Sequence, residues 1–407
     1  MAGFLNKKYI RFAIAAIIYI LVVIWIGNFW LLLGLPIIFD IYVTEKVNWT
    51  FWKKRHQKNS AFIEWLDALI FAVIAVTLIN IFLFQNYRIP TGSMEKSLLI
   101  GDHLFVSKLA YGPRMPNTPI AFPFTQNTMP IFKGQSWSNL VQWPYKRLKG
   151  FGKVKNNDVV VFNFPAGDTV VLEETATSYY EIVRSKAREL LESAIYSKLP
   201  AYPFAHYMTE ARKEIRDRFT IVYRPVDRRD NYVKRCIAIS GDTIAVKKAE
   251  VYVNGKLVPE IPTQQMNYVV ATNGTTINPK AFERLGIYRS DQNQISGSAY
   301  MLPLTRANAA TIARFTNVTE VAPLIKSPGE ASPQIFPHKG NYRWNEDNFG
   351  PLWVPAKGST VKIDTSNLCL YDRIIGVYEK NDLRVEGGTI YINNKPADSY
   401  TFRMNYY

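Results

Sequence analysis

The sequence predicts a membrane-anchored protein in which N-terminal transmembrane helices are followed by a mainly β domain with a helical insertion and an inserted β-rich subdomain. Three observations lead to this fold class. Apolar residues dominate 9–43 and 61–84, and runs of this length can cross a bilayer. Beyond residue 87, short β-branched and aromatic runs alternate with turn residues, as in strands. Between 175 and 218, apolar residues recur at helical spacing instead.

The composition indicates a basic protein with more than one structural unit. Its 407 residues exceed what one small core requires. The net charge of +16 would attract either nucleic acid or an anionic surface. The sequence has no spaced Cys/His set, aromatic RNA motif or basic heptad helix, which would indicate nucleic-acid binding. We therefore expect an anionic lipid membrane as a partner, and no nucleic acid.

The N-terminal segment, 1–60, is predicted to form a membrane hairpin and a basic cytoplasmic loop. Its apolar run breaks at Gly27-Asn28, which suits two short helices, with a single crossing as the alternative. The run is too long for a signal peptide and lacks a small-residue cleavage site. The basic residues expected on the cytoplasmic side follow the hairpin and are Lys46, Lys53, Lys54, Arg55, His56 and Lys58.

Residues 61–85 are predicted to form a transmembrane anchor. Because a basic cluster precedes this anchor, the chain after Tyr87 should lie on the outer side of the membrane. One or two crossings before residue 45 place the large domain on the same side. The orientation of that domain is therefore independent of the helix count.

The remaining chain divides by its periodicity. Strand-like runs occur at 98–106 and 158–165, and helical spacing occurs at 175–199 and 204–218. The predicted parts are a β-rich core at 86–165 and 219–256, a helical insertion at 166–218, and an inserted β-rich subdomain with returning strands at 257–407. Two similar segments, 246–256 and 385–395, read as hairpins with Asn-Gly and Asn-Asn turns.

The cysteines and histidines do not indicate a metal site or a cofactor. Cys236 and Cys369 have no metal-ligand spacing, and we expect two buried single thiols rather than a disulfide. The four histidines form no zinc-type pair. Only His103 lies near Ser93 in the sequence, which disfavours a His-based triad at that serine.

The main candidate for chemistry is Ser93, in the run Ile89-Pro90-Thr91-Gly92-Ser93-Met94 just beyond the anchor. A serine hydroxyl is a poor nucleophile until a base removes its proton. Lys234 could be that base if burial keeps it neutral. In a strand, Lys234 would point inward and Arg235 to solvent. The Thr91 hydroxyl and the Ser93 amide could stabilise an oxyanion.

A second lysine offers a competing interpretation. Ser93-Met94-Glu95-Lys96 fits Ser-x-x-Lys, the acylation motif of penicillin-binding proteins. That motif requires a helix start and the companions Ser-x-Asn and Lys-Thr-Gly. Lys357-Gly358-Ser359 has the wrong order, so we disfavour this interpretation.

Three segments in order resemble the conserved boxes of type I signal peptidases. Residues 89–106 resemble the serine box, 157–162 the next box and 232–242 the lysine box. The resemblance implies a bacterial inner-membrane serine endopeptidase with a Ser–Lys dyad on the periplasmic side and no cofactor. It would cleave signal peptides from exported preproteins after small residues, in the pattern Ala-x-Ala.

The resemblance also assigns roles by position. Ser93 corresponds to the nucleophile, Lys234 to the general base and Thr91 to the side-chain oxyanion donor. The positions that correspond to the small pockets for the substrate side chains are Tyr87, Ile89, Met94, Leu98, Tyr232 and Val233.

Two departures from the family pattern accompany the resemblance. Lys96-Ser97 stands where the family usually has Pro-Thr, and a Gly-Asp-Asn-Arg box does not follow the strand-like residues 404–407. Three accounts are consistent with this ending. The chain is a fragment of a longer enzyme, its site is completed in another way, or it is a non-catalytic relative that binds exported segments without cleaving them.

Overall fold

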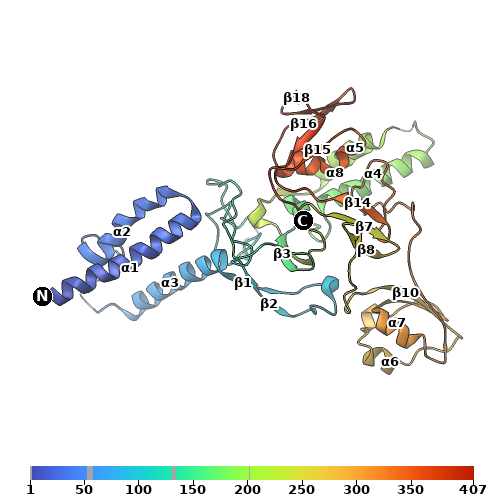
Figure 1. The fold of residues 1–407 in the computed structure, drawn as a ribbon, viewed down its shortest axis with the longest axis horizontal. Helices are drawn as coiled ribbons and strands as arrows, with labels where there is room; N and C mark the ends of the chain where they lie inside the picture. Colours follow the sequence, from blue (N-terminus) through green and yellow to red (C-terminus); the bar gives the residue numbers. More distant parts are fainter. Residues whose placement is uncertain (1, 53–57, 131–133, 201) are drawn as a thin grey trace. The chain divides into compact units, whose positions relative to one another are not determined.

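The computed structural model describes residues 2–52, 58–130, 134–200 and 202–407 (Figure 1). The helices are α1 (Ala2–Ile26), α2 (Leu35–Phe39), α3 (Ala61–Phe82), α4 (Tyr179–Tyr196), α5 (Phe204–Arg218), α6 (Pro279–Arg284), α7 (Arg306–Ile312) and α8 (Leu368–Arg373). The short 3-10 or π turns are η1 (Phe29–Gly34), η2 (Asp40–Thr44), η3 (Gly92–Met94), η4 (Pro165–Asp168), η5 (Val226–Arg228), η6 (Arg289–Asp291) and η7 (Ile374–Tyr378).

The strands are short, and most pair with antiparallel neighbours. They are β1 (Phe84–Arg88), β2 (His103–Ser107), β3 (Val159–Asn163), β4 (Thr169–Val171), β5 (Ile221–Tyr223), β6 (Asn231–Arg235), β7 (Thr243–Lys247), β8 (Glu250–Val253), β9 (Lys256–Leu257), β10 (Met266–Thr272), β11 (Asn293–Ser296), β12 (Ala299–Leu304), β13 (Val318–Pro323), β14 (Phe349–Trp353), β15 (Thr360–Lys362), β16 (Leu383–Glu386), β17 (Thr389–Ile392), β18 (Lys395–Pro396) and β19 (Ser399–Thr401).

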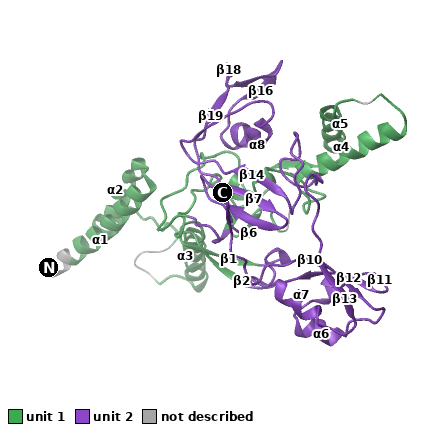
Figure 2. Cartoon of the chain, turned by 45° about the vertical axis from the view of Figure 1, so that its right-hand side comes forward, with its two compact units in different colours: residues 1–88, 103–153, 161–232 green, residues 89–102, 154–160, 233–407 purple. Residues whose placement is uncertain are grey.

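The chain forms two compact units, coloured green and purple in Figure 2. Unit 1 contains residues 1–88, 103–153 and 161–232. Unit 2 contains residues 89–102, 154–160 and 233–407. Each unit is therefore assembled from segments that are far apart in the sequence.

Unit 1 contains two helices long and apolar enough to cross a membrane, Lys7–Ile26 and Ala61–Phe82. The first apolar run breaks at Gly27, where φ is +67° and the chain turns back. The rings of Phe12 and Phe39 then meet with centroids 5.1 Å apart, so the chain turns at the predicted break. The basic residues 53–56 lie outside the described residues.

The anchor helix is continuous with a two-stranded ladder. α3 ends at Phe82, two residues before the predicted apolar end, because Phe84 begins β1 and pairs with Ser107 of β2. The strand predicted from residue 98 begins only at His103. The preceding segment cannot extend into a strand, because Gly101 has a positive φ of 97° and the chain before it turns.

The irregular segment 108–152 of unit 1 closes on itself at Gly112. This glycine has φ of +88°, and an added Cβ would lie 1.9 Å from the Leu148 carbonyl oxygen. Gly112→Ala should therefore destabilise the protein by more than about 2 kcal/mol in denaturant unfolding. Gly152→Ala is the matched control, since its Cβ would have ordinary 3.5 Å contact. Equal losses in both variants would contradict the close-approach argument.

Helices α4 and α5 confirm the two predicted helices, and α5 spans the predicted residues, 204–218. Their facing surfaces carry small residues, and both Ala187 and Ala211 are fully buried. Their core with β4 consists of Val171, Val183, Ala187, Tyr207, Ala211 and Ile215. Because this core is formed mostly by the two helices themselves, the amphipathic spacing was sufficient to predict them.

Unit 2 contains the same three-stranded meander twice. Strands β7–β8–β9 are joined by turns at Lys248-Ala249 and Asn254-Gly255, and β16–β17–β18 by turns at Gly387-Gly388 and Asn393-Asn394. All these turn residues have positive φ, as tight hairpin turns of this type require. The two hairpins predicted from the repeated segment are therefore confirmed.

A second sheet of unit 2 has the order β11-β12-β10-β13 and, with α6 and α7, forms what we call the β10–β13 module (residues 263–323). Both helices contribute to its core. The buried residues are Tyr268, Val270, Ile277, Phe282, Ile287, Tyr300, Leu302, Leu304, Ala309 and Ile312. The module thus has a hydrophobic centre of its own.

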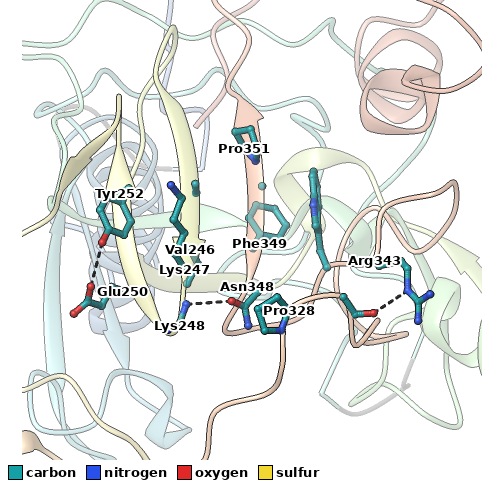
Figure 3. A pocket seen from close by; sticks show the side chains of 14 residues that line it. Val246, Lys247, Lys248, Glu250, Tyr252, Pro328, Arg343, Asn348, Phe349 and Pro351 are labelled. Atoms are coloured by element: carbon teal, nitrogen blue, oxygen red, sulfur yellow. Dashed lines mark hydrogen bonds between the residues drawn. The ribbon is translucent and has the colours of Figure 1, made fainter.

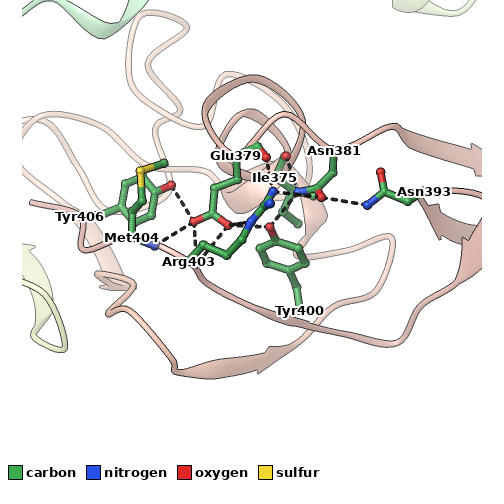
Figure 4. A network of polar contacts seen from close by, with 8 residues as sticks. All are labelled: Ile375, Glu379, Asn381, Asn393, Tyr400, Arg403, Met404 and Tyr406. Carbon is green, nitrogen blue, oxygen red and sulfur yellow. Dashed lines mark hydrogen bonds and ion pairs between the residues drawn. The ribbon is translucent and has the colours of Figure 1, made fainter. Parts of the chain in front are cut away.

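One buried carboxylate of unit 2 contacts several residues of the C-terminal segment (Figure 4). Glu379 is fully buried at its side chain and accepts hydrogen bonds from the hydroxyls of Tyr400 (2.6 Å) and Tyr406 (3.0 Å). It also accepts from the backbone amides of Arg403 (2.9 Å) and Met404 (3.2 Å). These bonds hold residues 400–406 in place, and within this segment Phe402 is buried in the core of the C-terminal strands and α8.

Candidate functional site

The serine-bearing segment of unit 2 begins at a buried residue. Ile89 is buried, and its amide and carbonyl exchange hydrogen bonds with Asp102 and Gly101, each 2.9 Å long. The Asp102 carboxylate also accepts the Leu99 amide at 2.8 Å. The chain between Ile89 and Asp102 is therefore a loop closed at its base.

Ser93 lies in the 3-10 turn η3 within this loop and is exposed. Glu95 N–H donates to the Gly92 carbonyl at 2.9 Å, and Leu98 N–H donates to the Met94 carbonyl at 2.7 Å. Thr91 precedes the turn in an extended conformation. Local backbone bonds therefore shape the turn around the serine.

Lys234 lies on β6, which pairs with β3. Beyond the strand end, Asn157 N–H donates to the Cys236 carbonyl at 2.6 Å, and Cys236 N–H donates to the Asp158 carbonyl at 2.8 Å. Arg235 is half-buried and its guanidinium donates to the Asn157 carbonyl at 3.0 Å. The prediction that Arg235 faces solvent is therefore wrong, because this carbonyl holds its side chain against the neighbouring segment.

The structure brings together the two residues on which the sequence hypothesis depends. Ser93 and Lys234 are 141 residues apart in the chain, both belong to unit 2, and the Lys234 ammonium donates a hydrogen bond to the Ser93 hydroxyl. Burial lowers the pKa of Lys234, because a charged amine loses hydration when it leaves water. A lysine with a lowered pKa beside a serine hydroxyl can act as a base toward it.

The other predicted residues differ in environment. Thr91 is exposed two residues before Ser93, and the pocket candidates Ile89, Met94, Leu98 and Val233 are buried or half-buried residues of unit 2.

The two tyrosine candidates belong to unit 1. Tyr87 is half-buried, and burial raises its pKa to about 12. Tyr232 is exposed and stacks on Phe164 with ring centroids 4.6 Å apart.

The cysteines are free thiols rather than a disulfide. Cys236 is buried as predicted, whereas Cys369 is only half-buried, so that part of the prediction is wrong. Gly340 packs against the Cys369 sulfur but does not cover it completely. Among the described residues, no three His, Cys, Asp or Glu side chains gather where they could hold a metal ion.

A hollow of about 640 Å³ lies on the β14–β7–β8 sheet of unit 2 (Figure 3). Its aromatic lining includes Tyr252, Trp344 and Phe349, and its basic lining includes Lys247 and Arg343. Sequence reasoning missed this hollow, because its residues come from separate stretches that meet only after folding.

Comparison with known proteins identifies a family. The signal peptidase, peptidase S26, family matches residues 62–308. Signal peptidase I of Haemophilus influenzae is 46% identical over 61 residues, which cover 14% of this chain and 18% of that protein. Signal peptidase I of Pseudomonas aeruginosa is 22% identical over 222 residues, 54% of this chain and 45% of that protein.

A third relative matches over a similarly short length. Signal peptidase I of Bacillus licheniformis is 45% identical over 56 residues, which cover 14% of this chain and 30% of that protein. The chain thus spans less than half the length of each of these curated relatives. No solved structure matches the chain.

Proposed function

The chain belongs to the signal peptidase, peptidase S26, family, and we propose that it is a membrane-bound serine endopeptidase that removes N-terminal signal peptides from exported preproteins. The observation that carries the proposal is the hydrogen bond between Lys234 and Ser93. Family membership and two apolar N-terminal helices support it. No metal or organic cofactor is needed for the chemistry proposed.

In the proposed reaction, Ser93 is the nucleophile and Lys234 the general base. Neutral Lys234 takes the hydroxyl proton while Ser93 Oγ bonds to the scissile carbonyl carbon. The Thr91 hydroxyl and the Ser93 amide donate to the resulting oxyanion. Lys234 then gives its proton to the leaving amine as the C–N bond breaks. A water molecule, deprotonated by Lys234, then attacks the Ser93 ester carbonyl. Lys234 returns the proton to Ser93 Oγ as the ester C–O bond breaks and the leader peptide is released.

The proposed substrate lies extended beside the strand that leads to Ser93 and the strand that carries Lys234, as an added strand. Small side chains before the cut would be selected by the apolar candidates Tyr87, Ile89, Met94, Leu98, Tyr232 and Val233. The Ala-x-Ala pattern is the proposed recognition sequence.

The membrane restricts the proposed substrates further. Helix α3 ends at Phe82, and Ser93 lies 11 residues further along the chain. We place the protein in the bacterial inner membrane with its catalytic domain on the periplasmic side. Trp143 and Phe122 are exposed in the segment whose Lys149 carbonyl accepts a hydrogen bond from Trp25 of α1, and such aromatic residues suit a membrane interface. The net charge of +16 favours an anionic lipid surface.

The proposed domain organisation follows the sequence prediction. Residues 86–165 and 219–256 form the catalytic core, with 166–218 and 257–385 as insertions. The helical pair α4–α5 and the β10–β13 module have cores of their own. This separation supports their role as additions to a smaller catalytic fold.

The proposal is tested by incubating the full chain, in lipid vesicles, with a preprotein whose leader ends in Ala-x-Ala. We expect a product whose new N-terminus follows the second alanine, and no product from Ser93→Ala. Ser185→Ala is the matched control, because Ser185 is an exposed serine on α4. Binding of the preprotein without any cleavage would overturn the proposal and favour a non-catalytic binding protein.

A further inference from the structure

The loop that carries Ser93 contains a residue in a rarely adopted conformation. Lys96 has φ of +65°, in the left-handed region that residues with a side chain seldom adopt. It follows Ser93 by three residues, and the neighbouring amides of Ser97 and Leu98 both donate to the Met94 carbonyl. Contacts from outside the loop would add to these local bonds in holding this conformation in place.

The β10–β13 module supplies contacts to this part of the loop. The Lys96 ammonium donates a hydrogen bond to the Gly286 carbonyl and lies 5.7 Å from the ring centroid of Tyr288. The Ser97 and Thr263 hydroxyls share a hydrogen bond of 2.8 Å. All of these residues belong to unit 2. The two residues after Glu95 thus both bind the module.

The carbonyl that receives Lys96 is itself held firmly. Gly286 N–H donates to the Glu283 carbonyl at 3.0 Å, and the next residue, Ile287, is buried in the module core. The Leu285 carbonyl accepts the Asn308 side chain at 2.9 Å. A Cβ at residue 286 would lie 2.8 Å from the Lys96 nitrogen, so glycine permits the close approach.

These contacts also separate the roles of the two lysines near Ser93. Lys96 completes the Ser-x-x-Lys pattern in the sequence, but its ammonium binds the module. Lys234, in contrast, binds the Ser93 hydroxyl. Within the loop, Lys96 is therefore placed to fix the backbone rather than to take the proton.

We propose that Lys96 is a positioning residue that fastens the Ser93 loop to the β10–β13 module and keeps the serine aligned with Lys234. This inference rests on the proposed peptidase function. The physical reason is that a nucleophile displaced by about 1 Å can lose up to 10²-fold in rate. The module thereby supports the catalytic geometry from outside the catalytic core.

The test compares Lys96→Met, which keeps the chain length and removes the charge, with Lys96→Arg, which can still donate to a carbonyl and stack on Tyr288. We expect kcat of Lys96→Met to fall about 10-fold with little change in KM, and Lys96→Arg to retain most activity. Lys280→Met, an exposed lysine of the same module, should behave as wild type.

A second measurement keeps the inference separate from the proposed function. Hydrogen exchange at the Ser97 and Leu98 amides should be faster in Lys96→Met than in wild type and Lys280→Met, whether or not the protein cleaves preproteins. Tyr288→Ala should also lower kcat. The loss in the double variant should be smaller than the sum of the two single losses in transition-state free energy, because both residues act through the same contact. Unchanged exchange in Lys96→Met, or a change confined to KM, would overturn the role of Lys96. If the wild type does not cleave the preprotein but the Ser97 and Leu98 amides still exchange faster in Lys96→Met, only the peptidase function is overturned.

Discussion

Replacing Lys234 with methionine is expected to lower kcat for preprotein cleavage by roughly 10²- to 10⁴-fold, the usual contribution of a general base. Lys234 is the side chain bonded to the Ser93 hydroxyl. Methionine preserves much of its length but accepts no proton from serine. The loss should appear in kcat, because the base acts in the transition state. The measurement is the initial rate of leader cleavage at saturating preprotein.

Lys234→Arg distinguishes a base from a positive charge. Arginine keeps the charge and the hydrogen-bond donor but is not deprotonated at any ordinary pH, so it should be as inactive as methionine. Lys256→Met, at an exposed lysine on β9, is the control and should leave the rate unchanged. Substantial activity in Lys234→Arg would show that Lys234 is not the base.

The pH profile follows from the same residue. Burial lowers the pKa of Lys234 from its ordinary value of 10.5, and only the neutral amine can accept the serine proton. The rate should therefore rise with pH and level off below pH 10.5 as Lys234 deprotonates. A cleavage rate that falls steadily as pH rises toward 10.5 would be incompatible with a lysine base.

Glu379→Ala is expected to have the largest effect on stability, about 3–5 kcal/mol in the free energy of unfolding. The Glu379 side chain has no exposed surface. Its removal would leave the Tyr400 and Tyr406 hydroxyls and the Arg403 amide without their acceptor. Unpaired buried donors each carry a substantial desolvation cost. Denaturant unfolding monitored by tryptophan fluorescence measures the change.

Glu386→Ala is the matched control for Glu379. Glu386 is an exposed acid on β16 that pairs with Arg384 at 3.3 Å, and surface pairs contribute at most about 1 kcal/mol. If Glu379→Ala unfolds at the same free energy as Glu386→Ala, the hydrogen bonds to Glu379 do not stabilise the protein as proposed.

Glu379 also predicts a pH dependence of stability. Burial raises its pKa, but hydrogen bonds from Tyr400, Arg403 and Tyr406 outweigh burial and lower it from the ordinary value of 4.5. The unfolded chain then binds more protons than the folded protein, so stability rises with pH. This contribution is complete above about pH 4.5 and is lost as pH falls through the lowered pKa. Glu379→Ala should flatten that part of the curve.

Local patterns predicted the elements whose stabilising contacts are close in sequence. Helix α5 matched its predicted range because its buried face and its helix-ending residues lie within one short segment. The turns at Asn254-Gly255 and Asn393-Asn394 were predicted because positive φ favours these residue types. In contrast, residues 98–102 read as strand but form a loop, because Gly101 has a positive φ and backbone bonds to Ile89 close the loop at its base.

Candidate site residues could be named from their chemistry, but their environments could not. Arg235 was expected in solvent and instead donates to the Asn157 carbonyl. Lys96 looked like a base only by its spacing from Ser93, and its partner, Gly286, is 190 residues away. No periodicity within a segment carries information about such a contact.

Sequence patterns were sufficient to predict the membrane-spanning candidates, the helical pair, the repeated hairpins and the chemical types of the serine and lysine. These features depend on hydrophobic length, spacing and turn preference, which are local properties. The packing of the folded chain was needed to show which lysine meets Ser93, which one binds the β10–β13 module, and where the aromatic and basic hollow forms. Those outcomes depend on contacts between segments more than 100 residues apart, which form only when the chain packs.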